Sequence, residues 1–299
     1  IGLDHRKQLG STLSAIAGEK AGILRSQTPA FAWVGRPTAK RALARRARDL
    51  GCPLADASQQ VRVLERRSRG WSGQEIRLET ERGDYRFELA LPGEHQARNL
   101  GLAVRAAETL ADLGWPGLGP RSFERGIAAC RWPGRLESMV LPDGDRPHAG
   151  RPPADKQVVL EAAHNADGAA QLIRFLEAVG EPVDLLFGAL EDKRPWTFLP
   201  RLAAGCRRVV LTTPPGERGM AAGRLRRWLP AAHPVVVEED PGRALDAALA
   251  EGGVPLLVCG SIYLIGAIRT RLRERFGVPA PAAEIRLGPA PDRSQTSSG

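Results

Sequence analysis

The sequence of 299 residues contains few cysteines and no long apolar run. Its four cysteines are far apart and form no Cys-x-x-Cys pair, which argues against a structural zinc site or a disulfide scaffold and is typical of a reducing cytoplasm: Cys52, Cys130, Cys206 and Cys259. No stretch approaches about eighteen consecutive apolar residues, so we expect no membrane-spanning helix. No signal peptide with a charged and then an apolar part opens the chain. We therefore expect a cytoplasmic protein with no membrane partner.

Signatures of nucleic-acid binding are also missing, although the net charge is +9. A basic chain invites a nucleic-acid hypothesis. However, the arginines are interleaved with acidic residues, and neither an aromatic-rich RNA-binding motif nor a zinc finger occurs. We expect no nucleic-acid partner. The charge fits either solvated helix faces in an arginine-rich protein or an anionic substrate, and composition alone does not decide between them.

The first part of the chain, residues 1–134, predicts helices combined with a small antiparallel sheet. Ser11 or Thr12 is a suitable N-cap for a helix whose apolar residues share one face. Gly51 is placed to end a second helix. The expected helices cover 13–24, 41–50, 96–113 and 122–129, and the expected strands cover 30–34, 61–66, 74–80 and 84–90.

Beyond Arg131 the pattern changes to short apolar runs that alternate with helical segments. The runs are 158–160, 183–187, 209–211, 235–237 and 256–258. Strands that are apolar on both faces and are separated by helices indicate an α/β domain with a largely parallel, doubly wound sheet. We expect this second domain to cover 135–278, with a surface loop at 142–155 and a disordered tail at 279–299.

Two residues of the first part could carry chemistry in their own right. Lys20 shares the apolar stripe of the first predicted helix with Ile16 and Leu24. Burial would favour a neutral amine, which can react with CO₂ to form a carbamate; the alternative is a lysine whose ammonium group reaches solvent. His5 follows a strand end, where active sites of open α/β sheets form. The alternative for His5 is a residue that only supports a turn.

Five segments stand out by their order and spacing: Ile1–His5 with Gly18–Ile23, Leu91–Asn99, Trp132–Glu137, Glu161–Asn165 and Cys259–Leu264. Any one of them is a weak signal. Together they resemble the folylpolyglutamate synthase and dihydrofolate synthase branch of the Mur ligase superfamily. The resemblance implies that residues 1–134 are the C-terminal part of a Mur-ligase-like ATPase domain. It further implies that 135–278 form the Rossmann-like domain that handles glutamate.

The resemblance also implies an ATP–Mg²⁺ site. It makes His5 a ligand of a Mg²⁺ ion that bridges the ATP phosphates, and it makes Lys20 a carbamylated catalytic residue. It places Asn99, Arg135 and Glu161 at ATP-contacting positions. The family has aspartate where this chain has Glu161, and the longer side chain alters the reach of the carboxylate.

For the second domain, the resemblance implies a site for L-glutamate. His164 becomes a catalytic and glutamate-binding residue, and Ser261 becomes a glutamate-binding residue. Both could equally be structural turn residues. The segment 192–194 reads Asp-Lys-Arg, where the family often has Asp-Lys-Asp.

The implied reaction is the ATP-dependent ligation of L-glutamate to a folate or dihydropteroate carboxylate through an acyl phosphate, by a monomer. Alternatives are another Mur-type amino-acid ligase and a non-catalytic fragment that binds a nucleotide or a partner protein. The sequence has no Gly-x-x-x-x-Gly-Lys-[Ser/Thr] phosphate loop. Because it also opens on Ile1, we interpret the chain as N-terminally truncated and expect it to be inactive alone. The sequence does not distinguish dihydrofolate synthase from folylpolyglutamate synthase or from a bifunctional enzyme.

Overall fold

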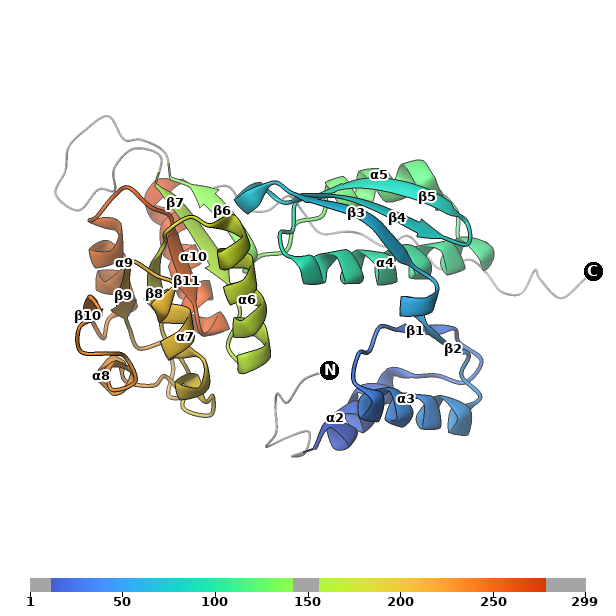
Figure 1. Ribbon diagram of the computed structural model, residues 1–299, viewed down its shortest axis with the longest axis horizontal. Coiled ribbons are helices and arrows are strands. Elements are labelled where there is room, and N and C mark those ends of the chain that lie inside the picture. The colour runs from blue at the N-terminus through green and yellow to red at the C-terminus, as the bar shows by residue number, and fades with distance from the viewer. Residues whose placement is uncertain (1–11, 142–155, 278–299) are drawn as a thin grey trace, which may run out of the picture. The chain divides into compact units, whose positions relative to one another are not determined.

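The computed structural model describes residues 12–141 and 156–277, which form two compact units (Figure 1). The first unit contains the described residues up to 69 and those of 73–130, and the second contains 70–72 and those from 131 onward. The chain thus passes between units four residues earlier than the expected boundary after Gly134. His5, the expected loop at 142–155 and the expected tail at 279–299 lie outside the described residues.

The first unit begins with two helices and two short parallel strands: α2 (Leu13–Lys20), α3 (Pro37–Leu50), β1 (Ala30–Ala32) and β2 (Leu54–Asp56). Thr12 is the N-cap of α2, since its hydroxyl accepts a hydrogen bond from the Ala15 amide at 3.2 Å. Gly51 ends α3 in a left-handed conformation with φ of 60°. Both predicted helix boundaries are confirmed. The helix α3 begins before its predicted start because Pro37 occupies the first turn, where proline is favoured.

The rest of the first unit is a three-stranded antiparallel sheet with two helices: β3 (Arg62–Ser68), β4 (Gln74–Thr80), β5 (Gly83–Leu89), α4 (Glu94–Asp112) and α5 (Pro120–Ala128). Burial alternates along β4, with Ile76 and Leu78 turned inward. They form a core with Leu100 and Val104 of α4 and Phe123 of α5. The three predicted strands and both helices are therefore confirmed.

The second unit is a six-stranded sheet in the order β10-β9-β8-β11-β7-β6. Five of its strands are parallel and were predicted from apolar runs: β7 (Gln157–Glu161), β8 (Asp184–Phe187), β9 (Arg208–Leu211), β10 (Val235–Val237) and β11 (Leu256–Cys259). The sixth, β6 (Arg135–Val140), is an antiparallel edge strand that was not predicted. It mixes exposed polar and buried apolar residues, so it lacks the apolar signature of the others.

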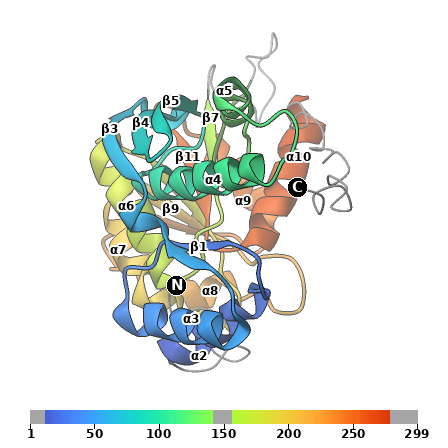
Figure 2. The same cartoon turned by 90° about the vertical axis from the view of Figure 1, so that its right-hand side faces the viewer.

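Helices cover both faces of this sheet (Figures 1 and 2). One face carries α6 (Ala166–Val179), α7 (Leu199–Ala204) and α8 (Ala222–Arg226), and the other carries α9 (Pro241–Leu249) and α10 (Ile262–Phe276). Alternate strand residues enter the two cores, for example Val159 on the first face and Val158 on the second. The doubly wound fold is confirmed.

The segment η3 (Gly70–Ser72) also belongs to the second unit, although it lies between β3 and β4 in the sequence. Trp71 joins the core on the α6 face and meets Phe175 edge to face, with ring centroids 5.2 Å apart. Its indole nitrogen donates to a Glu181 carboxylate oxygen at 3.0 Å. No local pattern in the sequence predicted this placement.

Candidate functional site

Two neighbouring parallel strands of the second unit end side by side. Cys259 at the end of β11 pairs with Glu161 at the end of β7. After β7 the chain continues into α6 on one face, whereas after β11 it continues into α10 on the other face. The carboxyl edge at which neighbouring strands send their loops to opposite faces is where open α/β sheets bind their ligands.

Backbone hydrogen bonds hold the two loops together at this edge. The Gly260 amide donates to the Ala163 carbonyl at 3.0 Å, and the Cys259 thiol donates to the same carbonyl at 3.2 Å. The Ala162 amide donates to the Gly134 carbonyl at 2.8 Å. Three segments far apart in the sequence therefore meet here, and His164 and Ser261 follow directly on two of them.

Ser261 is the N-cap of α10. Its hydroxyl accepts a hydrogen bond from the Tyr263 amide at 3.2 Å, and the residue is only 1% exposed. Asn165 caps α6 in the same way, accepting from the Gly168 amide at 2.8 Å. Ser261 thus has a structural role at the start of α10, where its hydroxyl accepts a hydrogen bond from the helix backbone.

His164 is half-buried at the start of the loop before α6. Its Nδ1 lies 2.8 Å from the Ala162 carbonyl oxygen. A carbonyl oxygen can only accept, so Nδ1 carries a hydrogen and donates it to Ala162. The ring is thus fixed in one tautomer at the carboxyl edge, as a proton-handling or ligand-binding residue requires.

Arg135 and Glu161 lie opposite each other across a bulge between β6 and β7. The guanidinium Nη1 of Arg135 is 3.8 Å from Oε1 of Glu161, and the other carboxylate oxygen accepts from the Leu136 amide at 2.9 Å. Leu136 has a φ of +47°, a conformation rarely adopted by branched residues.

Burial raises the pKa of Glu161 to about 7, against the Arg135 charge and the Leu136 and Ala163 amides, which lower it. The ordinary pKa is 4.5, so between pH 4.5 and about pH 7 Glu161 keeps its proton in the folded protein but has lost it in the unfolded chain. The stability that Glu161 contributes is therefore present below pH 4.5 and is lost as the pH rises through about 7.

We predict that Glu161→Gln flattens this pH dependence. The wild-type free energy of unfolding should fall by about 2–3 kcal/mol more than that of the variant between pH 5 and pH 8. Urea unfolding at several pH values measures the difference, and other titrating groups cancel in the comparison. Parallel curves for the two proteins would show that Glu161 does not retain a proton.

The remaining expected site residues lie in the first unit. Asn99 on α4 is exposed, and its amide nitrogen donates to Oε1 of Gln96 at 2.9 Å. Lys20 is also exposed, so the expectation that its amine is buried is wrong. It is the last residue of α2, and the following 3₁₀ turn (Ala21–Ile23) buries Ala21 instead. The proposed role of Lys20 therefore rests on the resemblance alone.

A second polar group along the carboxyl edge was not predicted. Arg218, after β9, donates to the Tyr263 hydroxyl at 3.0 Å and lies over the ring, 5.5 Å from its centroid. Its other Nη is 3.9 Å from a carboxylate oxygen of Asp192. Arg218 thereby links Asp192, in the segment where this chain reads Asp-Lys-Arg, to Tyr263 in the first turn of α10.

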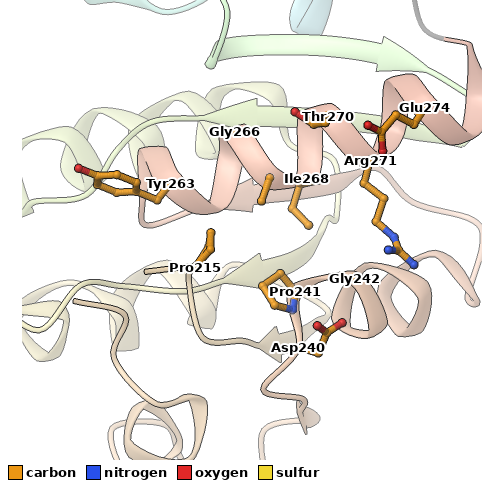
Figure 3. A pocket seen from close by; sticks show the side chains of 11 residues that line it. Pro215, Asp240, Pro241, Gly242, Tyr263, Gly266, Ile268, Thr270, Arg271 and Glu274 are labelled. Carbon is orange, nitrogen blue, oxygen red and sulfur yellow. The ribbon is translucent and has the colours of Figure 1, made fainter. Parts of the chain in front are cut away.

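A groove of about 540 Å³ lies between α10 and the turn that begins α9 (Figure 3). The Arg271 guanidinium packs closely against Gly242 in this turn, since a Cβ on Gly242 would lie only 2.7 Å from Nη1 of Arg271. The polar lining residues are Asp240, Tyr263, Thr270, Arg271 and Glu274. None of the predicted site residues lines this groove.

Two features are absent from the described residues. Within 12–141 and 156–277, no three or more histidine, cysteine, aspartate or glutamate side chains are grouped so that they could hold a metal ion. No helix in the described part of the chain is long and apolar enough to cross a membrane.

Comparison with known proteins gives a consistent result. The chain is 31% identical to the folylpolyglutamate synthase of Lacticaseibacillus casei over 281 residues, which are 91% of this chain and 60% of that protein. It is 27% identical to the dihydrofolate synthase/folylpolyglutamate synthase of Bacillus subtilis over 286 residues, 91% of this chain and 61% of the relative. The chain is a homologue of folylpolyglutamate and dihydrofolate synthases. No protein-family model matches it.

Solved structures of folylpolyglutamate synthases share the fold of this homologue. The structure of the Mycobacterium tuberculosis enzyme was determined in complex with ADP and AMPPCP. It superimposes on this chain with a TM-score of 0.72 at 28% sequence identity. The superposition includes 91% of this chain and 62% of the M. tuberculosis chain. The apo form from L. casei gives 0.70 at 29% identity, covering 91% and 59%. The expected Mur-ligase-like α/β fold is confirmed. The chain spans about 60% of the length of these relatives.

Proposed function

We propose that this chain is part of an ATP-dependent ligase that joins L-glutamate to a folate or dihydropteroate carboxylate. The observation that carries the proposal is the similarity to folylpolyglutamate synthases over 91% of the chain, together with the site at the carboxyl edge. The relatives' names support glutamate as the amino acid and a folate as its acceptor. The complex of the M. tuberculosis enzyme with ADP and AMPPCP supports ATP as the second substrate.

The chemistry follows from the weak electrophilicity of a carboxylate. Transfer of the γ-phosphoryl group of ATP to the carboxylate forms an acyl phosphate and releases ADP. The glutamate amine then attacks the acyl carbon and loses a proton, and the tetrahedral intermediate expels phosphate to leave an amide. Arg135 is half-exposed and cationic, and we propose that it balances the charge of the phosphoryl group during transfer. Glu161 would contact the nucleotide only if its carboxylate turned away from the Leu136 amide.

We propose that the carboxyl edge of the second unit binds glutamate. His164 is held there in a fixed tautomer, and the α6 and α10 N-termini begin beside it. Helix N-termini carry partial positive charge, which favours the carboxylates of an amino acid. Since Ser261 is buried, it would act by positioning α10 and not by direct contact.

We propose that His5 and a carbamate on Lys20 would help to hold a Mg²⁺ ion; His5 lies outside the described residues 12–141 and 156–277. In a magnesium-dependent ligase such an ion would neutralise phosphate charge. A carbamate on Lys20 requires an amine that can lose its proton. Near-normal turnover of a Lys20→Arg variant would exclude the carbamate.

The expected effect of His164→Ala is an increase of about tenfold in the KM for glutamate, because a hydrogen bond to a charged ligand is lost. The KM for ATP should change little. Steady-state kinetics of the complete enzyme, with each substrate varied separately, measures both values. His233→Ala is the matched control, since His233 precedes β10 and lies outside the site. An unchanged glutamate KM in His164→Ala would remove this edge from the glutamate site.

A further inference from the structure

The turn that leads into β6 carries Arg135 on a constrained backbone. The Arg135 amide donates to the Trp132 carbonyl at 3.2 Å, which closes a β-turn. Pro133 at its second position and Gly134 at its third, with a φ of +69°, are the residues that a type II turn favours. Leu136, directly after Arg135, has a φ of +47°. A leucine keeps such a strained conformation only where surrounding contacts fix it.

Three hydrogen bonds fix this turn. The Gly134 carbonyl accepts from the Ala162 amide at 2.8 Å, and the Leu136 amide donates to the Glu161 carboxylate at 2.9 Å. The Gly134 amide donates to Oε2 of Glu137 at 2.9 Å. The first two contacts tie the turn to the end of β7. The third depends on the side chain of Glu137, which must itself be held in place.

Glu137 is held by Arg269 of α10. Nε of Arg269 lies 3.0 Å from Oε1 of Glu137 and 3.1 Å from Oε2. The two side chains are only 16% and 19% exposed, so solvent screens this pair less than it screens an exposed one. The pair thus connects the turn to a helix residue 132 positions further along the chain.

The helix α10 gives this pair a firm support. Ile268 and Leu272, on either side of Arg269, are 1% and 0% exposed and belong to the core between α10 and the sheet. Ile265 of the same helix packs against the turn, since a Cβ on Gly134 would lie 3.4 Å from its Cγ2. A side chain on a packed helix holds its partner more precisely than a side chain on a loop.

We propose that Glu137 and Arg269 are positioning residues for Arg135 in phosphoryl transfer, an inference that rests on the proposed function. Arg269 holds Glu137, Glu137 holds the Gly134 amide, and the turn then presents the half-exposed Arg135 side chain. Groups that stabilise charge in a transition state act most strongly when they are already in place. A displacement of about 1 Å in such a group can lower a rate by up to about a hundredfold.

The alternative is a purely structural role, in which the pair only fastens the edge strand β6 to α10. However, β6 already pairs with β7 from Arg135 to Val140 and buries Leu136 and Met139. The carboxylate of the pair instead contacts the backbone at Gly134, within the turn that precedes the strand. This location favours a role in the conformation of the turn.

Hydrogen exchange of this 299-residue chain tests whether the pair holds the turn. In Arg269→Ala, the amides of 134–136 should exchange about tenfold faster than in the wild type, because Glu137 is no longer held. Glu137→Gln removes only the charge and is the milder second variant, with a smaller increase in the same direction. Arg269→Lys keeps a cation beside Glu137 and should stay within about threefold of the wild type.

The matched control for exchange is Arg273→Ala, which removes an exposed arginine one turn further along α10. The amides of 134–136 should exchange at the wild-type rate in this variant. Wild-type exchange in both Arg269→Ala and Glu137→Gln would overturn the proposal. An equal increase in Arg273→Ala and Arg269→Ala would overturn it as well, because the effect would then be general to the helix.

Steady-state kinetics of the complete enzyme tests whether the pair acts through Arg135. Arg269→Ala should lower kcat about tenfold and leave the KM for glutamate within about twofold, whereas Arg135→Ala should lower kcat about a hundredfold. Adding Arg269→Ala to Arg135→Ala should lower kcat no further, since the group that the pair positions is already gone. A second tenfold loss in the double variant would show a structural effect and overturn the positioning role.

The two experiments separate this proposal from the proposed function. Independent losses of kcat in an active enzyme would overturn only the positioning role. A complete wild-type enzyme that forms no amide would overturn the proposed function. Faster exchange in Arg269→Ala would then still uphold the pair as the support of the turn.

Discussion

Replacing Asp184 with alanine is expected to lower the free energy of unfolding of the second unit by about 3–5 kcal/mol. Asp184 begins β8 at the amino edge of the sheet and has 0% exposure. Its carboxylate accepts from Arg207 at 2.9 and 2.7 Å and from Arg208 at 3.2 Å, and Nζ of the buried Lys156 lies 3.9 Å away. When the Asp184 carboxylate is removed, the buried cations Arg208 and Lys156 lose the negative charge that lies next to them.

Burial alone would raise the pKa of Asp184, but hydrogen bonds from Arg207 and Arg208 outweigh it and hold the pKa below its ordinary value. A lowered pKa means that the unfolded chain takes up the proton first as the pH falls. The contribution of Asp184 is therefore present above the unfolded pKa of about 3.8 and is lost as the pH falls through the folded value.

Denaturant unfolding followed by tryptophan fluorescence measures this effect, because four of the six tryptophans belong to the second unit. Asp246→Ala is the matched control. Asp246 also pairs with two arginines, Arg271 and Arg275, but its side chain is 37% exposed. Its loss should cost less than about 1 kcal/mol. Similar losses in the two variants would show that burial does not set the strength of the Asp184 cluster.

The second large effect is expected for Gly260→Ala, which should destabilise the second unit by about 3 kcal/mol or more. Gly260 has a φ of +106°, where a side chain is strained. A Cβ there would come within 2.5 Å of the Gly188 carbonyl oxygen and 2.6 Å of the Phe187 ring. Because Gly260 precedes the cap of α10, the variant should also impair glutamate binding. Urea unfolding and glutamate KM are the two measurements.

The control for this prediction is Gly180→Ala. Gly180 ends α6 with a φ of +71°, and a Cβ there would meet nothing within 4 Å. The cost should stay near 1 kcal/mol, from backbone conformation alone. If Gly260→Ala proved no worse than Gly180→Ala, the close approach of the loops at the carboxyl edge would be refuted.

Much of the fold could be predicted because its patterns are local. The strands β7, β8, β9 and β11 are apolar on both faces, so their residue types reveal a covered parallel sheet. Caps and stops such as Thr12 and Gly51 act within a few residues. In contrast, β6 is an exposed edge strand, and Trp71 is buried by residues about a hundred positions away, so neither has a local signal.

The candidate site was predicted only in part. The resemblance assigned His164 and Ser261 to one site, and the structure brings them to one edge of the sheet, since they follow the paired strands β7 and β11. The prediction that Lys20 is buried was wrong. It treated residues 13–24 as one continuous helix, whereas α2 ends at Lys20 and a 3₁₀ turn follows. The hydrogen bond from the Leu136 amide to the Glu161 carboxylate depends on a bulge in β6, and no pattern in the sequence predicts this bulge.

The measurement that tests the central claim most directly is ATP-dependent incorporation of labelled L-glutamate into dihydropteroate or a reduced folate. It should use the product of the complete reading frame that encodes these residues. The account predicts a glutamylated product formed in equal amounts with ADP and phosphate, and no product when ATP or glutamate is omitted. Amide formation with a different amino acid but not with glutamate, or nucleotide binding by the complete product without any amide formation, would contradict it.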